Sequence, residues 1–333
     1  MRCRHCYQNL EYLEKEMNLK QKKKIIDSFY KFCKKLQRAP VITFTGGEPF
    51  IIKRELFRVI AYCRKKYPEI RFGILSNGTL ITEQDAKKLK KMAPSYVQIS
   101  LDGATEKTHD DLRGKGNFKR AIAGIKRLVS NGVRTTVMTV TSKKNKKEIP
   151  KLMGLCKELG VSSFSVSELV PEGNGRQLRQ KMLKPEELKE LYVSIAEKRA
   201  EIEKNGGQLK LDTYRPLWVL LEKDLKKRKL CAKAGGACSA GFSALALMPN
   251  GDVMPCRRMD AVIGNLTKQT FFDIWYASEL LEKLRDSNNS ECNTCKFYER
   301  CGGCKAVSKA MLGSFWKKDP LCWKRKAARI KKH

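Results

Sequence analysis

The strongest constraint on this chain of 333 residues is a set of eight cysteines in its last third. Four of them lie in one short segment, C-N-T-C-K-F-Y-E-R-C-G-G-C. Thiolates at such spacings bind zinc or iron–sulfur clusters without long loops. Eight ligands are enough for two four-ligand sites, so we expect two metal centres at this end of the chain. The eight are Cys231, Cys238, Cys256, Cys292, Cys295, Cys301, Cys304 and Cys322.

The cellular compartment follows from the 13 cysteines and from the distribution of apolar residues. The N-terminus opens on M-R-C-R-H-C-Y without the apolar stretch of a signal peptide, and we expect no membrane span. We therefore expect a cytoplasmic protein. In that reducing environment, clustered cysteines bind metal more often than they form disulfides.

The formal net charge of +34 has two interpretations. It is compatible with a polyanionic partner such as RNA, which would make the chain a non-catalytic iron–sulfur or zinc protein. The lysines, however, are spread over nearly every predicted helix instead of forming one stripe. We therefore expect them on solvated helix faces, and we expect no nucleic-acid partner.

The first two-thirds of the chain alternate predicted strands and helices at intervals of roughly 30 residues, the period of parallel βα units. The region after about residue 176 differs, because two helices (184–204 and 215–228) flank a short strand at 209–212 that we interpret as a connector. A hairpin around Asn250-Gly251 then leads into the cysteines. Predicted strands span 41–45, 71–76, 96–101, 133–140 and 162–167, and predicted helices span 18–37, 53–66, 117–129 and 146–159.

Three motifs in this order carry a family resemblance: Cys3-Arg4-His5-Cys6-Tyr7, then T-G-G-E-P, then S-L-D-G. Together they resemble the radical S-adenosylmethionine (SAM) superfamily, and the cysteine-rich tail resembles its SPASM subfamily. The resemblance implies an α/β fold, a partial (β/α)6 TIM-like barrel that lacks its first strand, followed by a small SPASM domain that binds iron–sulfur clusters. We place the barrel at residues 1–205, and the connector with the SPASM domain at 206–333.

The resemblance also implies cofactors and chemistry. A 4Fe–4S cluster would bind SAM, and its electron would cleave SAM to a 5′-deoxyadenosyl radical that abstracts a substrate hydrogen. Two auxiliary 4Fe–4S clusters would lie in the tail. The implied partners are a peptide or small-molecule substrate with carboxylates and an electron donor such as ferredoxin or flavodoxin.

Residue roles are carried over by matching motifs. Cys3 and Cys6 match cluster ligands, and Tyr7 matches the aromatic residue that follows them. The implied SAM-binding residues are Gly46, Gly47, Glu48, Ser76, Asn77, Ser100, Asp102, Arg113 and Gly173. The implied auxiliary ligand sets are Cys231, Cys238, Cys256 and Cys304 for one cluster, and Cys292, Cys295, Cys301 and Cys322 for the other. Two structural zinc sites are the alternative for the tail.

The sequence departs from the family pattern C-x-x-x-C-x-x-C, because the first cysteine would stand four residues before Cys3, ahead of Met1. Either the start was assigned too late or radical chemistry has been lost. We expect the first, because the downstream motifs are intact.

The substrate is indicated by the residues that follow Cys256. Sulfatase-maturing relatives carry an acidic residue there, whereas this chain carries Arg257 and Arg258. Paired guanidinium groups suit a substrate carboxylate, as in an acidic peptide or in a tetrapyrrole with propionates. We therefore name Arg257, Arg258 and the nearby Asp260 as candidate catalytic residues. The alternative is that the arginines only balance an anionic cluster.

Overall fold

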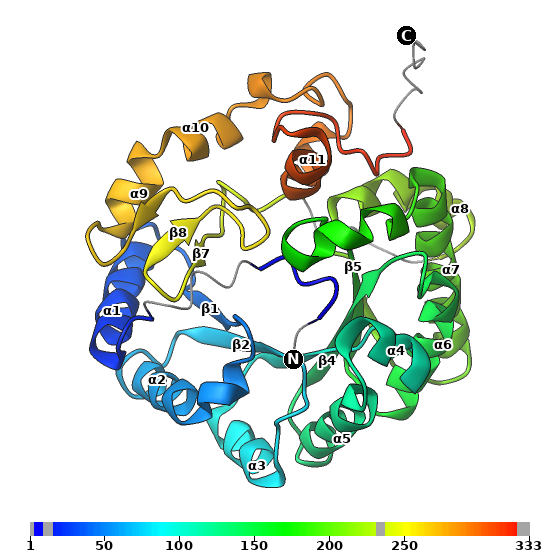
Figure 1. Cartoon of the computed structure of the whole chain (residues 1–333), viewed down its shortest axis with the longest axis horizontal. Coiled ribbons are helices and arrows are strands. Elements are labelled where there is room, and N and C mark those ends of the chain that lie inside the picture. Colours follow the sequence, from blue (N-terminus) through cyan, green and yellow to red (C-terminus); the bar gives the residue numbers. More distant parts are fainter. Residues whose placement is uncertain (1–2, 9–15, 231–236, 325–333) are drawn as a thin grey trace.

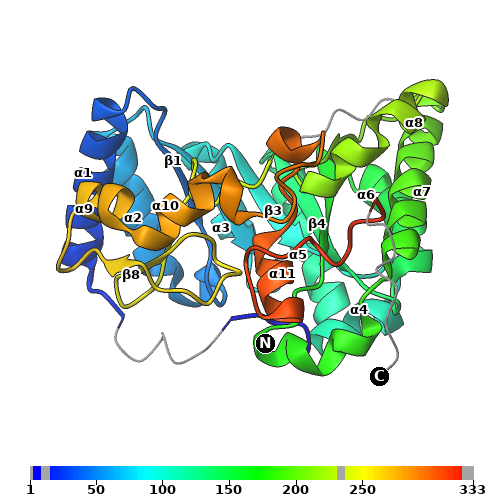
Figure 2. The same cartoon turned by 90° about the horizontal axis from the view of Figure 1, so that it is seen from above.

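The computed structural model describes residues 3–8, 16–230 and 237–324. Its centre is a six-stranded parallel sheet in the order β1-β2-β3-β4-β5-β6, curved as a partial barrel inside a ring of helices (Figures 1 and 2). The expected α/β partial barrel is confirmed. The strands are β1 (Val41–Phe44), β2 (Arg71–Ser76), β3 (Tyr96–Ser100), β4 (Thr135–Thr141), β5 (Ser163–Glu168) and β6 (Lys210–Asp212).

The sixth strand corrects one element of the sequence interpretation. We expected 209–212 in a connector, but β6 pairs in parallel with β5, with Ser163 opposite Lys210 and Ser165 opposite Asp212. The strand is short and half-exposed, so the sequence pattern gave little sign of its partner. The boundary near residue 205 stays a prediction.

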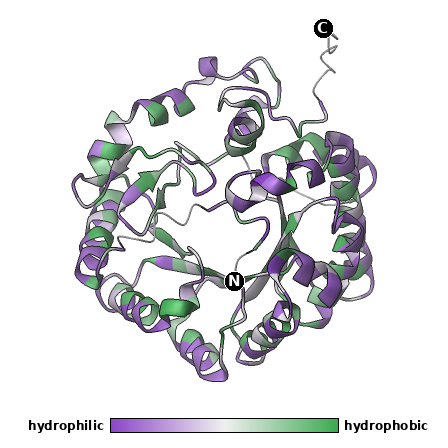
Figure 3. Ribbon diagram, in the orientation of Figure 1, coloured by the Kyte–Doolittle hydropathy of each residue, from purple (hydrophilic) through white to green (hydrophobic). Residues whose placement is uncertain are grey.

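Helices cover the outer face of the sheet. Capping residues fix several starts: Asn18 and Gln21 form a capping box on α1, and Thr82 and Asp85 form one on α3. Figure 3 shows hydrophilic and hydrophobic stretches on the outer helices, as expected of helices that pack one face on a sheet. These helices are α1 (Leu19–Lys35), α2 (Lys53–Lys66), α3 (Glu83–Met92), α4 (Glu106–Arg113), α5 (Asn117–Ser130), α6 (Ile149–Glu158), α7 (Pro185–Lys204) and α8 (Glu222–Lys227).

The cysteine-rich region fills the open side of the ring (Figure 1). Its hairpin turns at Gly251, whose φ of +93° suits a residue without a side chain. The hairpin belongs to a three-stranded antiparallel sheet in the order β7-β8-β9. The elements here are β7 (Ala246–Leu247), β8 (Asp252–Met254), β9 (Gly264–Asn265), α9 (Phe271–Ala277), α10 (Glu279–Arg285) and α11 (Lys305–Leu312).

An aromatic cluster joins the two regions. Phe32 of α1 is buried and stacks on Phe271 of α9 at 5.5 Å, with Phe272 at 4.9 Å and Trp275 at 6.0 Å between ring centroids. The backbone N–H of Met17 also donates to the carbonyl of Pro249 at 2.8 Å. Helix α1 therefore packs against the cysteine-rich region as well as against the barrel.

Candidate functional site

The carboxyl ends of the parallel strands meet at one edge of the barrel, and the turn after β1 lies there. Gly46 has a φ of +137°, and a Cβ atom built at Gly46 or Gly47 would meet no heavy atom within 4 Å. The backbone of this turn therefore faces open space, and a ligand can approach it closely.

Glu48 ties this turn to the next strand. Its carboxylate accepts hydrogen bonds from the Ser76 hydroxyl at 2.7 Å, from the backbone N–H of Asn77 at 2.7 Å and from that of Phe50 at 3.2 Å. Burial raises the pKa of Glu48 despite these bonds. A ligand cation, such as the amino group of SAM, would offset the cost of burying the ionised carboxylate. The hydrogen bonds of Glu48 bring together the predicted residues Gly46, Gly47, Glu48, Ser76 and Asn77.

Asp102, at the end of β3, is fully buried and its oxygens are already engaged. Arg113 Nε donates to Oδ2 at 2.6 Å and the backbone N–H of Val140 donates to Oδ1 at 2.8 Å. Burial opposes ionisation, but Arg113 lowers the pKa of Asp102 to about 2. Asp102 and Arg113 thus form a buried ion pair. Direct contact of these two residues, or of the neighbouring Ser100, with a cofactor stays a prediction.

The Cys3–Tyr7 loop is held at the same edge of the barrel. The backbone N–H of Arg4 donates to the Leu112 carbonyl at 3.0 Å, and that of Gly175 donates to the Cys6 carbonyl at 3.2 Å. Gly173 has a φ of +53°, and a Cβ there would lie 2.8 Å from the Cys6 carbonyl oxygen. Gly173 therefore supports this loop directly. Its predicted place beside an adenine stays a prediction.

Several buried polar groups near Cys3 can still bind a ligand. Arg113 Nη1 lies 3.9 Å from Cys3 Sγ. Burial is the main cause that raises the pKa of Cys3, and the nearby Cys6 raises it further. His5 Nδ1 and His109 Nε2 are buried without a hydrogen-bond partner among the described residues. Two thiols beside orphaned buried nitrogens fit an iron–sulfur cluster with its bound ligand.

The two arginines after Cys256 point to opposite sides of the barrel opening. Arg257 Nη1 donates to Thr45 Oγ1, just before Gly46, at 3.1 Å. Its guanidinium also lies over the Tyr7 ring, 5.8 Å from the centroid. Arg258 instead donates from Nη1 to Ser167 Oγ of β5 at 3.3 Å and from Nη2 to Cys304 Sγ at 3.4 Å. The two neighbours therefore have different surroundings.

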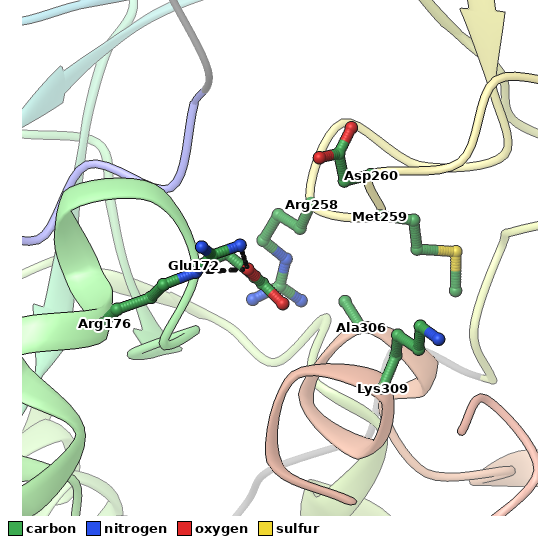
Figure 4. Close-up of a pocket in the computed structure, with 7 residues that line it drawn as sticks. All are labelled: Glu172, Arg176, Arg258, Met259, Asp260, Ala306 and Lys309. Atoms are coloured by element: carbon green, nitrogen blue, oxygen red, sulfur yellow. Dashed lines mark hydrogen bonds and ion pairs between the residues drawn. The ribbon is translucent and has the colours of Figure 1, made fainter. Parts of the chain in front are cut away.

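Arg258 and Asp260 also line a cavity of about 180 Å³ between the loop after β5, the loop after Cys256 and α11 (Figure 4). Within it, Arg176 forms an ion pair with Glu172 at 2.8 Å. The cavity thus combines cationic and anionic groups from three parts of the chain. Its lining residues are Glu172, Arg176, Arg258, Met259, Asp260, Ala306 and Lys309.

The C-terminal cysteines separate into two groups by proximity. The pKa of Cys238 is raised first by burial and then by its neighbour Cys304, with Cys256 also close by. Cys231 of the same predicted set lies outside the described residues. In the other group, burial first and then neighbouring cysteines raise the pKa values of Cys292, Cys301 and Cys322, and the exposed Cys295 is one of those neighbours. This grouping matches the two predicted ligand sets, whose assignment stays a prediction.

The donor type fits iron–sulfur clusters, since each group consists of thiols alone. Within residues 3–8, 16–230 and 237–324, no three His, Cys, Asp or Glu side chains lie close enough together to hold a single metal ion.

Sequence reasoning missed the buried charges around these cysteines. Lys305 is 7% exposed and donates from Nζ to Ser290 Oγ at 3.0 Å, with thiols of both groups nearby. Asp319 is 1% exposed and accepts from the backbone N–H of Cys304 at 2.8 Å. Lysine and aspartate usually lie on the surface, so the sequence gave no sign that the fold buries Lys305 and Asp319.

Comparison with known proteins decides the family. The sequence profile of the Radical SAM superfamily matches residues 1–156, and that of the SPASM iron–sulfur cluster-binding domain matches residues 238–304. The AdoMet-dependent heme synthase of Methanosarcina barkeri is 30% identical over 295 residues, which cover 85% of this chain and 82% of that protein. The chain belongs to the radical SAM superfamily. Its C-terminal region is a SPASM domain. As a member of this superfamily, the protein is an enzyme that uses SAM and 4Fe–4S clusters.

Other proteins are also similar to this radical SAM enzyme. The Fe-coproporphyrin III synthase of Methanosarcina barkeri is 29% identical, over 97% of this chain and 84% of that protein. The fold is shared with Streptococcus suis SuiB, at a TM-score of 0.75 and 21% identity over 96% of this chain and 74% of that chain. It is also shared with anSMEcpe bound to AdoMet, at a TM-score of 0.73 and 20% identity over 96% and 90% of the two chains.

In the described part of the chain, no helix has the length and apolar character needed to cross a bilayer.

Proposed function

We propose that this radical SAM enzyme acts on a porphyrin that carries carboxylate side chains. One observation carries the proposal: the Arg257 guanidinium lies at the end of β1, hydrogen-bonded to Thr45 directly before the open Gly46-Gly47 turn. A substrate carboxylate gripped by Arg257 would therefore lie next to the predicted SAM site.

The proposed cofactors supply the radical, since SAM bound at a reduced 4Fe–4S cluster yields a 5′-deoxyadenosyl radical that removes a substrate hydrogen. Cys3 and Cys6 would hold that cluster, and Glu48 would orient SAM through its amino group. Arg257 would fix the distance between the substrate carbon and the radical, which governs the rate of a positioned reaction.

The names of two relatives favour a porphyrin over other substrates that carry carboxylates. These relatives carry the names AdoMet-dependent heme synthase and Fe-coproporphyrin III synthase, and they match 85% and 97% of this chain. A porphyrin propionate that loses one hydrogen atom, CO₂ and one further electron becomes a vinyl group. The further electron needs an acceptor, a role that suits an auxiliary cluster.

The test is a turnover assay on the reconstituted, reduced protein. We expect about twelve irons per chain, as for three four-iron clusters. With iron coproporphyrin III, we expect 5′-deoxyadenosine and a product lighter by CO₂ and two hydrogens for each side chain. No 5′-deoxyadenosine from fully loaded protein would contradict the radical chemistry. Its formation without any change in the porphyrin would contradict only the substrate.

Peptide modification is the second candidate, because this chain shares its fold with SuiB, which has been solved with its precursor peptide. A relative from Bacillus subtilis, the antilisterial bacteriocin subtilosin biosynthesis protein AlbA, is 27% identical over 91% of this chain and 64% of that protein. Turnover of an acidic peptide, with the porphyrin unchanged, would favour this candidate.

We also propose an electron donor and a cellular location for this enzyme. A ferredoxin or flavodoxin would reduce the cluster held by Cys3 and Cys6. A cytoplasmic location is supported by the large number of free thiols, since disulfides are rare in that compartment.

A further inference from the structure

Arg258 makes a direct contact with a predicted cluster ligand. Its Nη2 lies 3.4 Å from Cys304 Sγ, within the range of an N–H···S hydrogen bond. The other arm of the same guanidinium donates to Ser167 of β5 at 3.3 Å. The planar group is therefore held between the barrel and the SPASM domain, with one donor aimed at the sulfur.

A second arginine approaches the same sulfur. Arg215 is largely buried, and its Nε donates to the carboxylate of Glu168, which is itself 5% exposed. Its Nη2 is buried and lacks a hydrogen-bond partner among the described residues. Cys304 lies near this guanidinium. A buried donor without a partner, beside a predicted cluster ligand, fits a site for cluster sulfur.

The acidic groups nearby accept hydrogen bonds from donors other than Arg258. Glu168 takes hydrogen bonds from Arg215 and Tyr192, and Asp319 takes the backbone N–H of Cys304. Arg258 Nη2 therefore stays available to Cys304 Sγ as a cationic donor. Hydrogen bonds and positive charge at a ligand sulfur stabilise the reduced, more negative cluster, and thus raise its reduction potential.

We propose that Arg258, assisted by Arg215, raises the reduction potential of the auxiliary cluster bound through Cys304, while Arg257 serves the substrate. A cluster of higher potential is a better electron acceptor. Arg258 is on this view a positioning residue that acts through Cys304. The inference does not depend on which substrate the enzyme uses.

The test is an EPR-monitored redox titration of the full chain, reconstituted after Cys3→Ala and Cys6→Ala so that only the auxiliary clusters report. In an Arg258→Gln variant, one auxiliary potential should move lower and the other should stay unchanged. The matched control is Arg257→Gln, which changes the adjacent residue in the same way and should move neither potential. Unchanged potentials in a fully loaded Arg258→Gln variant would overturn the proposal.

Two further variants cover other outcomes. Cys304→Ala should remove the iron of one cluster, and unchanged iron content would show that Cys304 is no ligand and overturn the inference. If Arg258→Gln fails to load that cluster, Arg258→Met takes its place, since it removes both the charge and the donors but keeps an unbranched side chain. A lowered potential in that variant supports the proposal, and an unchanged potential contradicts it.

Discussion

At the scale of single residues, Arg257 and Arg258 show how neighbours acquire different tasks. They follow Cys256 directly, and the sequence treats them as one pair. In the fold, Arg257 contacts the neutral Thr45 and Tyr7, whereas Arg258 contacts a cysteine sulfur. A ligand carboxylate can therefore pair with Arg257 at little electrostatic cost.

We predict that Arg257→Gln lowers product formation by roughly 100-fold, the scale of misplacing a substrate by about 1 Å. Iron content and SAM cleavage without product should be preserved, because Arg257 forms no hydrogen bond to a cysteine among the described residues. The measurement compares product with 5′-deoxyadenosine in one assay. Arg38→Gln, an exposed position between α1 and β1, is the control. Equal losses of product and of iron would show a structural role for Arg257.

Asp102 gives a prediction about stability and pH. Its pKa of about 2 lies below the unfolded value of 3.8, so the ionised carboxylate stabilises the fold at neutral pH. That contribution, on the order of 2 kcal/mol, is present above pH 4 and is lost as the pH falls towards 2.

Asp102→Asn should lower the free energy of unfolding at neutral pH by about 3–5 kcal/mol, because it leaves the buried Arg113 charge without its partner. Denaturant unfolding followed by circular dichroism measures this loss. The acid-dependent part should also vanish from the variant's pH profile. The control is Asp111→Asn at an exposed pair with Arg4, which should cost less than about 1 kcal/mol. A similar small cost for both would contradict the importance of the buried pair.

At the scale of elements, the strand ends depend on the helices behind them. Helix α5 carries Gly124, and a Cβ built there would lie 2.2 Å from the carbonyl oxygen of Gly78. Gly78 itself donates its N–H to Ser76 Oγ, which in turn donates to Glu48. Because Gly124 has no side chain, α5 can pack closely on the Gly78 turn that orients Glu48.

Gly124→Ala should cost about 1–3 kcal/mol in stability, as expected of overpacking, and should weaken SAM binding by displacing this turn. Helix α6 offers the control, since a Cβ at Gly154 meets nothing within 4 Å. Gly154→Ala should be neutral or stabilise by up to about 1 kcal/mol, because Ala favours a helix over Gly. Thermal unfolding and calorimetric titration with SAM measure both effects. Equal behaviour of the two variants would contradict the close packing of α5 on the turn.

At the scale of the whole molecule, the SPASM domain completes the ring that the six-stranded sheet leaves open (Figure 1). The aromatic cluster of α1 and α9 joins the domains on one side, and the contacts of Arg258 join them at the centre. The placement of the arginines therefore depends on how the two domains pack.

Phe32→Ala should lower the free energy of unfolding by about 3–5 kcal/mol, the usual cost of removing a buried aromatic side chain. It should also increase hydrogen exchange in the β7-β8 hairpin, because α1 supports that region. Tyr276→Ala on α9 is the control, since Tyr276 is 62% exposed and should change stability little. Unchanged exchange in the Phe32 variant would show that the hairpin is held by other contacts.

The amino-acid sequence alone determined the fold class, the family and the order of the chemical motifs. Parallel βα units have a period and alternation that local residue patterns express, and Gly46, Gly47 and Glu48 occupy one short motif. The two cysteine ligand sets were implied by the family resemblance, since spacing alone would not separate Cys301 from Cys304.

Only the tertiary structure decided the sixth strand, the buried Lys305 and Asp319, and the separate surroundings of Arg257 and Arg258. These depend on contacts between residues far apart in the chain: Lys210 with Ser163, Arg258 with Ser167, and Arg257 with Thr45. A charged residue has the same local pattern whether it faces water or a sulfur. Its surroundings are fixed only when the SPASM domain packs onto the barrel.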